Sequence, residues 1–105
     1  MTHDSDFEGK TVVTTGAGSG IGRETSVAFG EAGANVVVGD IDRDGGEATV
    51  ETITDETDGE ATFVEVDVTD DDAVEAMIET ATAEYGGLDV AFNNAGIGGT
   101  FDSTD

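Results

Sequence analysis

Cysteine is absent from the 105-residue chain, and only three residues are basic: Lys10, Arg23 and Arg43. The absence of cysteine excludes disulfides and thiolate metal sites, and it fits a reducing cytoplasm. No run approaches the roughly 20 apolar residues of a membrane helix, and no basic and then apolar signal opens the chain. We therefore expect a cytoplasmic protein with no membrane partner.

The deficit of basic residues leaves the chain strongly acidic. Asp and Glu number 25, so the formal net charge is −22. Such a surface repels nucleic acid and anionic membranes, which both need basic patches, so we expect no nucleic-acid partner. The acids are spread along the chain, a composition that resembles proteins of salt-accumulating halophiles, in which dense counterions screen the repulsion. An acidic protein of ordinary salt requirement is the weaker interpretation.

Apolar periodicity predicts strands that alternate with helices, without proline and without internal repeats. The chain is too short for a nucleotide domain and a separate substrate domain, and we expect residues 1–9 to be a loose tail. Strands joined by crossover helices indicate an α/β fold with a doubly wound parallel sheet. The expected elements, in β-α-β-α-β-α-β order, are the strands Thr11–Thr15, Val36–Val38, Thr62–Val66 and Leu88–Asn93 and helices over residues 21–32, 48–57 and 70–85. Thr69 or Asp70 is expected to be the N-cap of the third helix.

A glycine-rich loop stands between the first strand and the first helix. Residues 15–22 read Thr-Gly-Ala-Gly-Ser-Gly-Ile-Gly, which fits the spacing T-G-x-x-x-G-x-G with Gly16, Gly20 and Gly22. The generic G-x-G-x-x-G spacing and the Walker phosphate loop do not fit. A helix that follows such a loop directs its free N–H groups and its positive dipole end at phosphate oxygens. A merely flexible turn is the alternative, but the context favours a bound nucleotide cofactor.

An acidic residue follows the second strand at a suitable distance from this loop. Asp40 lies 18 residues after Gly22, where a carboxylate accepts hydrogen bonds from the adenosine ribose and repels a 2′-phosphate. Ser19, rather than a basic residue, precedes the second motif glycine, and Ile41 follows Asp40. This pattern predicts NAD in preference to NADP, and Arg43 is the one residue that could reverse it. A surface acid without a role is the alternative.

Three motifs together resemble the N-terminal part of a short-chain dehydrogenase/reductase, over about residues 8–105. Besides the glycine loop, Asp67-Val68 follows the third strand and Asn93-Asn94-Ala95-Gly96 ends the fourth. The resemblance implies a Rossmann-type sheet with strand order 3-2-1-4 and hydride transfer between a nicotinamide cofactor and an alcohol or carbonyl. By the same resemblance, the residues that contact the cofactor, from the pyrophosphate through the adenosine to the nicotinamide-side ribose, are Gly16, Ser19, Gly20, Ile21, Gly22, Asp40, Ile41, Asp67, Val68, Asn94, Ala95 and Gly96.

The chain departs from the family pattern in two ways. Thr14 lies where the family usually carries an apolar residue, and a buried hydroxyl there needs a partner. The family uses a Ser, a Tyr and a Lys four residues after that Tyr. Here the only tyrosine is Tyr85, followed four residues later by Asp89, and the only lysine is Lys10. We therefore expect Tyr85 to be a packing residue and general acid/base catalysis to have no agent in this chain.

These departures predict an incomplete NAD-binding Rossmann domain over residues 1–105, without catalytic residues of its own. A non-catalytic nucleotide-binding module and an inactive truncated gene product remain as alternative functions. We also expect the strand Leu88–Asn93 to lie at a sheet edge, where its hydrogen-bonding groups favour self-association.

A calcium-binding pattern is also present. Residues 40–51 match D-x-D-x-D-G-x5-E, with Asp40, Asp42, Asp44, Gly45 and Glu51 at its key positions. An EF-hand needs a helix that enters the loop, whereas a strand is expected there. We therefore expect no metal site.

Overall fold

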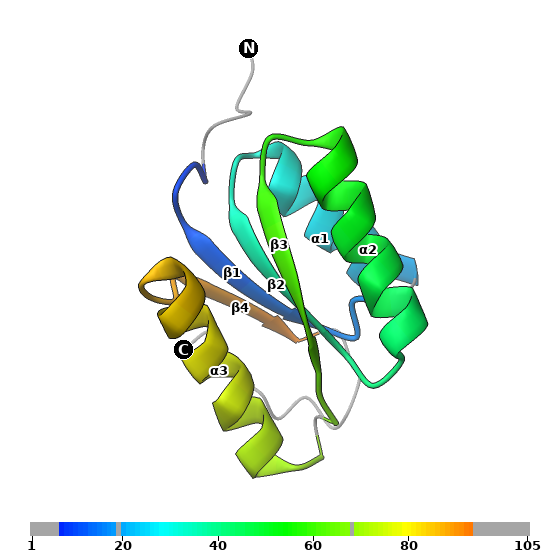
Figure 1. Ribbon diagram of the computed structural model, residues 1–105, viewed down its shortest axis with the longest axis vertical. Coiled ribbons are helices and arrows are strands. Elements are labelled where there is room, and N and C mark those ends of the chain that lie inside the picture. The colour runs from blue at the N-terminus through cyan, green and yellow to red at the C-terminus, as the bar shows by residue number, and fades with distance from the viewer. Residues whose placement is uncertain (1–6, 19, 68, 94–105) are drawn as a thin grey trace.

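The computed structural model describes residues 7–18, 20–67 and 69–93. Strands and helices alternate along the whole of this part, as predicted (Figure 1). The elements are β1 (Thr11–Thr15), α1 (Gly20–Glu31), β2 (Asn35–Asp40), α2 (Arg43–Glu56), β3 (Glu60–Glu65), α3 (Asp71–Tyr85) and β4 (Val90–Asn93).

The four strands form one parallel sheet in the order β3-β2-β1-β4, which is the predicted order. In the register, Val13 of β1 lies between Val37 of β2 and Ala91 of β4. Helices α1 and α2 cover one face of the sheet and α3 covers the other (Figure 1). Because all strands run in one direction, their carboxyl ends meet at one edge, which is where ligands bind in sheets of this kind.

Alternate residues of the central strands build a separate core on each face. Val12, Val36 and Val38 pack with Ile53 of α2, whereas Val13 and Val37 pack with Met77 and other residues of α3. These five valines are each at most 1% exposed. A continuous run of β-branched residues is typical of a parallel strand that is buried on both faces.

The hydroxyl of Thr14 has the partner that its burial requires. Thr14 Oγ1 lies 2.7 Å from Oγ of Ser26 in α1, and Ser26 Oγ donates to the carbonyl of Gly22 at 2.8 Å. Both side chains are fully buried. A hydrogen bond between two buried hydroxyls offsets the cost of removing them from water, and here it attaches β1 to the first turns of α1.

Helix α2 begins at Arg43, whereas the sequence predicted Ala48 as its first residue. The prediction began the helix too late because Gly45 and Gly46 have low helix propensity. In the structure, both glycines lie inside the helix. A Cβ atom on Gly45 would lie 2.6 Å from the carbonyl oxygen of Gly18, and a Cβ atom on Gly46 would overlap the ring of Phe63. Close packing of the helix on its neighbours therefore outweighs the local preference.

Other boundaries differ by one or two residues. Strand β2 is longer at both ends than Val36–Val38, and β3 ends one residue before Val66. Strand β4 begins at Val90, and Leu88 packs on the α3 core before the strand starts. Helix α3 begins after Asp70, whose carboxylate accepts the N–H groups of Asp72 and Ala73. Asp70 is therefore the N-cap, and not Thr69.

The predicted loose tail does not extend to Phe7. Residues 7–9 form a turn, and the ring of Phe7 meets that of Phe29 edge to face, with centroids 5.2 Å apart. The amide of Phe7 also donates to the carbonyl of Ala32. Burial of the aromatic ring of Phe7 against α1 is favourable because it removes apolar surface from water. Residues 1–6 lie outside the described part. No helix in the described ranges has the length and apolar character needed to cross a membrane.

We predict that folding and self-association both depend on salt. A net charge of −22 destabilises the compact state in dilute buffer, and molar salt shortens the Debye length to about 3 Å. Strand β4 pairs with β1 alone among the described strands, so it lies at a sheet edge, which is a template for association. Circular dichroism and light scattering across a potassium chloride series are expected to show a poorly folded monomer in dilute buffer and a folded, self-associating species in molar salt.

A compact monomer that stays folded in dilute buffer would contradict this expectation. So would a species that folds in molar salt and remains monomeric at all protein concentrations tested.

Candidate cofactor site

The loop between β1 and α1 adopts the backbone conformation that its glycines permit. Gly16 has φ of 64° and Gly20 has φ of 59°, values in the left-handed region that side chains with a Cβ rarely occupy. Gly20 is exposed and begins α1. The loop therefore ends where α1 begins, and the first N–H groups of a helix have no partner within the helix, which makes this position suitable for an anion.

The end of β2 holds this loop in place. The amide of Gly18 donates to Oδ2 of Asp40 at 2.7 Å, and the amide of Ala17 donates to the carbonyl of Gly39 at 3.1 Å. The other oxygen, Oδ1 of Asp40, accepts the amide of Asp42 at 2.8 Å. Asp40 is half-buried. The carboxylate predicted to bind the adenosine ribose thus lies directly beside the predicted pyrophosphate loop.

Two further side chains, Arg23 of α1 and Thr49 of α2, form hydrogen bonds with the loop. Arg23 NH2 donates to the carbonyl of Gly18 at 2.6 Å, and Arg23 Nε donates to Oγ1 of Thr49 at 3.0 Å. The Thr49 hydroxyl donates to the carbonyl of Ala17 at 2.8 Å. Thus the amide and the carbonyl of both Ala17 and Gly18 are hydrogen-bonded.

Two isoleucines at this edge of the molecule are exposed. Ile21 in the first turn of α1 is 68% exposed and Ile41 after β2 is 63% exposed, and they are the exposed large hydrophobic residues of the described part. Single exposed apolar side chains are common on protein surfaces, so their exposure leaves both isoleucines accessible to a ligand without indicating one. Both were predicted to contact the cofactor.

The region after β3 brings a third predicted element to the same edge. The amide of Val66 donates to the carbonyl of Asp40 at 3.1 Å, so Asp67 follows directly beside the end of β2. Asp67 Oδ1 accepts both the amide and the hydroxyl of Thr69, at 3.0 and 2.7 Å. These hydrogen bonds, the one from the hydroxyl first, lower the pKa of the Asp67 carboxyl. Asp67 is therefore an exposed carboxylate that stays ionised in mild acid.

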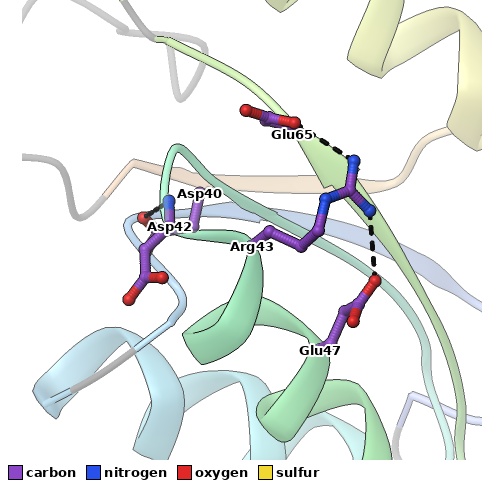
Figure 2. Close-up of polar contacts among 5 residues, drawn as sticks. All are labelled: Asp40, Asp42, Arg43, Glu47 and Glu65. Carbon is purple, nitrogen blue, oxygen red and sulfur yellow. Dashed lines mark hydrogen bonds and ion pairs between the residues drawn. The ribbon is translucent and has the colours of Figure 1, made fainter.

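Arg43 is held away from Asp40. Figure 2 shows its guanidinium extended between two carboxylates, with NH1 3.1 Å from Glu47 and NH2 3.1 Å from Glu65. The guanidinium also lies 5.4 Å from the centre of the Phe63 ring, a cation–π distance. The hydrogen bonds to Glu47 and then Glu65 raise the pKa of Arg43. The one residue that could favour a 2′-phosphate is thus paired elsewhere.

The structure brings together those predicted residues that it describes. Gly16 and Gly20 form the loop, Asp40 bonds to it, and Gly22 is buried in α1, where its carbonyl accepts Ser26. Five predicted positions lie outside the described residues: Ser19, Val68, Asn94, Ala95 and Gly96.

Sequence reasoning missed four residues that hold the loop: Gly18, Arg23, Gly45 and Thr49. Arg23 carried a usable signal, because a cation in the first turn of a helix opposes the helix dipole and must have another partner. The Gly45-Gly46 pair was a second signal, since glycines within a helix often mark close packing. Thr49 had no signal in the sequence.

The calcium-like pattern has a different explanation. Residues 40–51 form the end of β2 and the first turns of α2, so they do not form a twelve-residue calcium loop with an entering helix. Gly45 is needed because Gly18 approaches it closely, and Asp40 accepts two backbone amides.

Neither the tyrosine nor the lysine of the chain lies at this edge. Tyr85, at the end of α3, packs with the core that contains Met77 and is partly buried, as predicted. Burial, and then the charges of Glu60 and Glu84, raise the pKa of Tyr85, the opposite of activation as a base. Lys10 precedes β1 and so lies at the amino edge of the sheet.

Comparison with known proteins agrees with this arrangement. A family model described as short chain dehydrogenase matches residues 10–105. The 2,5-dichloro-2,5-cyclohexadiene-1,4-diol dehydrogenase of Sphingobium indicum is 44% identical over 93 residues, which are 89% of this chain and 36% of that protein. An uncharacterized oxidoreductase of Thermotoga maritima is 45% identical over 92 residues, 88% of this chain and 36% of that protein.

Solved structures show the same similarity. A hydroxysteroid dehydrogenase from Escherichia coli matches with a TM-score of 0.83 and 37% identity, over 93% of this chain and 42% of that chain. A short chain dehydrogenase from Mycobacterium avium matches with a TM-score of 0.80 and 42% identity, over 87% of this chain and 35% of that chain. The chain thus spans about a third of the curated relatives, 36% of the first. It belongs to the short-chain dehydrogenase/reductase family of oxidoreductases, whose members bind nicotinamide dinucleotides.

Proposed function

We propose that this chain binds NAD in preference to NADP at the carboxyl edge of the sheet, for hydride transfer to or from an alcohol or carbonyl in the cytoplasm. The observation that carries the proposal is the hydrogen bond of 2.7 Å between the Asp40 carboxylate and the Gly18 amide. This bond places a negative charge beside the loop that would hold the pyrophosphate. Ribose hydroxyls can donate to such a carboxylate, whereas a 2′-phosphate would be repelled.

The charges around Asp40 support the choice of NAD. A site for NADP needs a cation to compensate a 2′-phosphate, and the nearest candidate in sequence is Arg43. Its guanidinium is engaged by Glu47 and Glu65, and Figure 2 shows these partners on the side away from Asp40. The residue that follows Asp40 is Ile41, which carries no charge. A 2′-phosphate would therefore meet Asp40 without compensation.

The remaining positions along the cofactor follow from the family motifs. We assign the pyrophosphate to the loop of Gly16, Ser19 and Gly20 and to the first turn of α1 with Ile21 and Gly22. We assign the adenosine to the ends of β2 and β3 and the nicotinamide-side ribose to the segment after β4. The residues of these two assignments are Asp40, Ile41, Asp67 and Val68 for the adenosine and Asn94, Ala95 and Gly96 for the ribose.

The part of hydride transfer that these 105 residues supply is cofactor binding. Bound NAD would supply the hydride acceptor. The chain contains no tyrosine followed four residues later by lysine, so proton transfer to or from the substrate oxygen has no agent here. A nucleotide-binding module without catalytic activity of its own is therefore the second candidate function for these residues.

We expect calorimetry in molar salt to show that NAD binds at least about tenfold more tightly than NADP, which corresponds to ~1.4 kcal/mol. Asp40→Asn keeps an oxygen that can accept the Gly18 amide but removes the charge. This variant is expected to bind NADP more tightly relative to NAD. Asp55→Asn, which removes an exposed charge at the far end of α2, is the matched control and should leave the preference unchanged.

The double variant Glu47→Gln, Glu65→Gln tests the role of the paired arginine. Release of Arg43 from its carboxylate partners is expected to favour NADP, because the guanidinium then becomes available for a phosphate. Tighter binding of NADP than NAD by the unaltered chain would overturn the assignment.

A second expectation concerns the pH dependence of adenine binding at Asp67. The ionised carboxylate can accept a hydrogen bond from the amino group of adenine, and its lowered pKa keeps it ionised as the pH falls through the ordinary carboxyl range. Any stability that this carboxylate contributes is present above the pKa of the unfolded chain and is lost as the pH falls through the lower, folded-state pKa. Thr69→Ala should raise the Asp67 pKa and shift the acid limit of AMP binding to higher pH.

Carbon-detected NMR titration of the carboxyl groups measures this pKa directly. Thr80→Ala, which removes an exposed hydroxyl bonded only within α3 among the described residues, is the matched control. An Asp67 pKa that is the same in the Thr69 variant and in the unaltered chain would contradict the expectation.

We further expect the 105-residue chain to show no oxidoreductase turnover by itself, since it lacks the acid/base pair. The assay supplies NAD and a broad panel of secondary alcohols and follows absorbance of the reduced cofactor. Gly20→Asp, which places a bulky anion in the loop at a left-handed position, provides the background rate. Turnover clearly above this background would refute the expectation.

A further inference from the structure

Arg23 lies in the first turn of α1 but does not face the open end of the helix. Its NH2 group donates to the carbonyl of Gly18 at 2.6 Å and, more weakly, to that of Gly45 at 3.4 Å. Its Nε donates to Oγ1 of Thr49 at 3.0 Å. The guanidinium therefore lies between the glycine loop and the first turns of α2.

Thr49 is the second part of the same arrangement. Its side chain is fully buried, and its oxygen accepts the Arg23 Nε–H while its hydroxyl lies within hydrogen-bond distance of the carbonyls of Ala17 and Gly45, at 2.8 and 3.1 Å. Arg23 and Thr49 thus hold two consecutive carbonyl oxygens of the loop, those of Ala17 and Gly18. Both oxygens are directed to the α2 side.

This direction matters for an anionic ligand. Each carbonyl oxygen is the negative end of a peptide dipole, and it would repel a pyrophosphate that approached it. A loop whose carbonyls are fixed towards α2 leaves the N–H groups that open α1 for the phosphates. Preorganised donors also bind more tightly, because the loop loses less freedom when the ligand arrives.

The position of Arg23 has an electrostatic cost that its hydrogen bonds offset. A cation at the N-terminus of a helix is destabilising, and this chain has only three basic residues. Hydrogen bonds from a guanidinium to carbonyls are charge-assisted and strong, so they offset that cost. Among the described residues, the hydrogen bonds from Arg23 run to Thr49 and Gly45 of α2 and to Gly18 in the loop.

We infer that Arg23 and Thr49 are positioning residues for pyrophosphate binding: they fix the carbonyls of Ala17 and Gly18 from behind the loop. The inference rests on the proposed function, because it concerns the same dinucleotide site. The alternative role for Arg23 is a direct ion pair with the pyrophosphate, and that role would need only the positive charge of the side chain. The two roles can be separated by ligand, by salt and by conservative substitution.

The test compares two probes in the 105-residue chain at molar salt. ADP-ribose contains the pyrophosphate and is measured by calorimetry, and adenosine lacks it and is measured by NMR shift changes. Thr49→Val removes the hydroxyl and keeps the shape, and we expect it to weaken ADP-ribose binding by about tenfold or more, with adenosine binding unchanged. Thr49→Ser retains the hydroxyl and should restore the affinity. Thr54→Val makes the same change at an exposed site on α2 and is the control.

Arg23→Gln and Arg23→Lys provide the second comparison. We expect both to weaken ADP-ribose binding, because lysine keeps the charge but lacks the planar group that reaches Thr49 and Gly18 together. The loss should persist between one and three molar salt, since short hydrogen bonds of a half-buried group are weakly screened. Circular dichroism checks the fold of each variant, and if Thr49→Val does not fold, the two Arg23 variants decide.

Each outcome has a distinct meaning. Full affinity in Arg23→Lys, or a loss that disappears as salt rises, would overturn the inference in favour of a direct ion pair. Equal losses for adenosine and ADP-ribose would also overturn it, because they would indicate a general structural role. If the unaltered chain binds adenosine but not ADP-ribose, the proposed function itself fails and the inference fails with it.

Discussion

The hydrogen bond between the Asp40 carboxylate and the Gly18 amide joins the end of β2 to the loop that follows β1. It connects two segments that are separated by the whole of α1. The close approach of Gly18 to Gly45 extends the same contact to α2. Any side chain at Gly18 or Gly45 would force these segments apart, so these two glycines are needed for close packing.

The rest of the candidate site depends on this contact. Asp40 can face an adenosine ribose only while its strand end stays beside the loop, and Arg23 and Thr49 reach the loop carbonyls only while α2 lies against it. Asp67 reaches the same edge because Val66 bonds to the carbonyl of Asp40. The parallel direction of the strands brings all these groups to one edge.

The chain has a net charge of −22, and each of its three basic residues has a different place in the structure. Arg23 holds the loop and Arg43 is paired with Glu47 and Glu65, while Lys10 lies at the opposite edge of the sheet. No described cation is therefore left to neutralise a phosphate directly. At the proposed site, phosphate binding would rely on backbone N–H groups and the helix dipole, and counterions in concentrated salt would screen the surrounding acids.

Sequence reasoning could predict those features that depend on local pattern. Buried β-branched runs such as Val36–Val38 predicted the central strands, and the glycine spacing predicted the loop. Asp40 was selected by its spacing from the loop and Asp67 by the family resemblance, and their contacts with a cofactor stay predictions. Thr14 was correctly expected to need a partner, but its partner could not be named, because Ser26 reaches it only when α1 lies on the sheet.

The amino-acid sequence by itself determined the order of elements, the parallel α/β class and the family, since each depends on hydrophobic period and motif spacing along the chain. Tertiary structure alone decided where α2 begins, why Gly45 and Gly46 lie in a helix, and which partners Arg23, Arg43 and Thr49 have. The physical reason is that close packing and hydrogen bonds between distant segments outweigh local propensities of about 1 kcal/mol per residue. Such contacts exist only once the chain has folded.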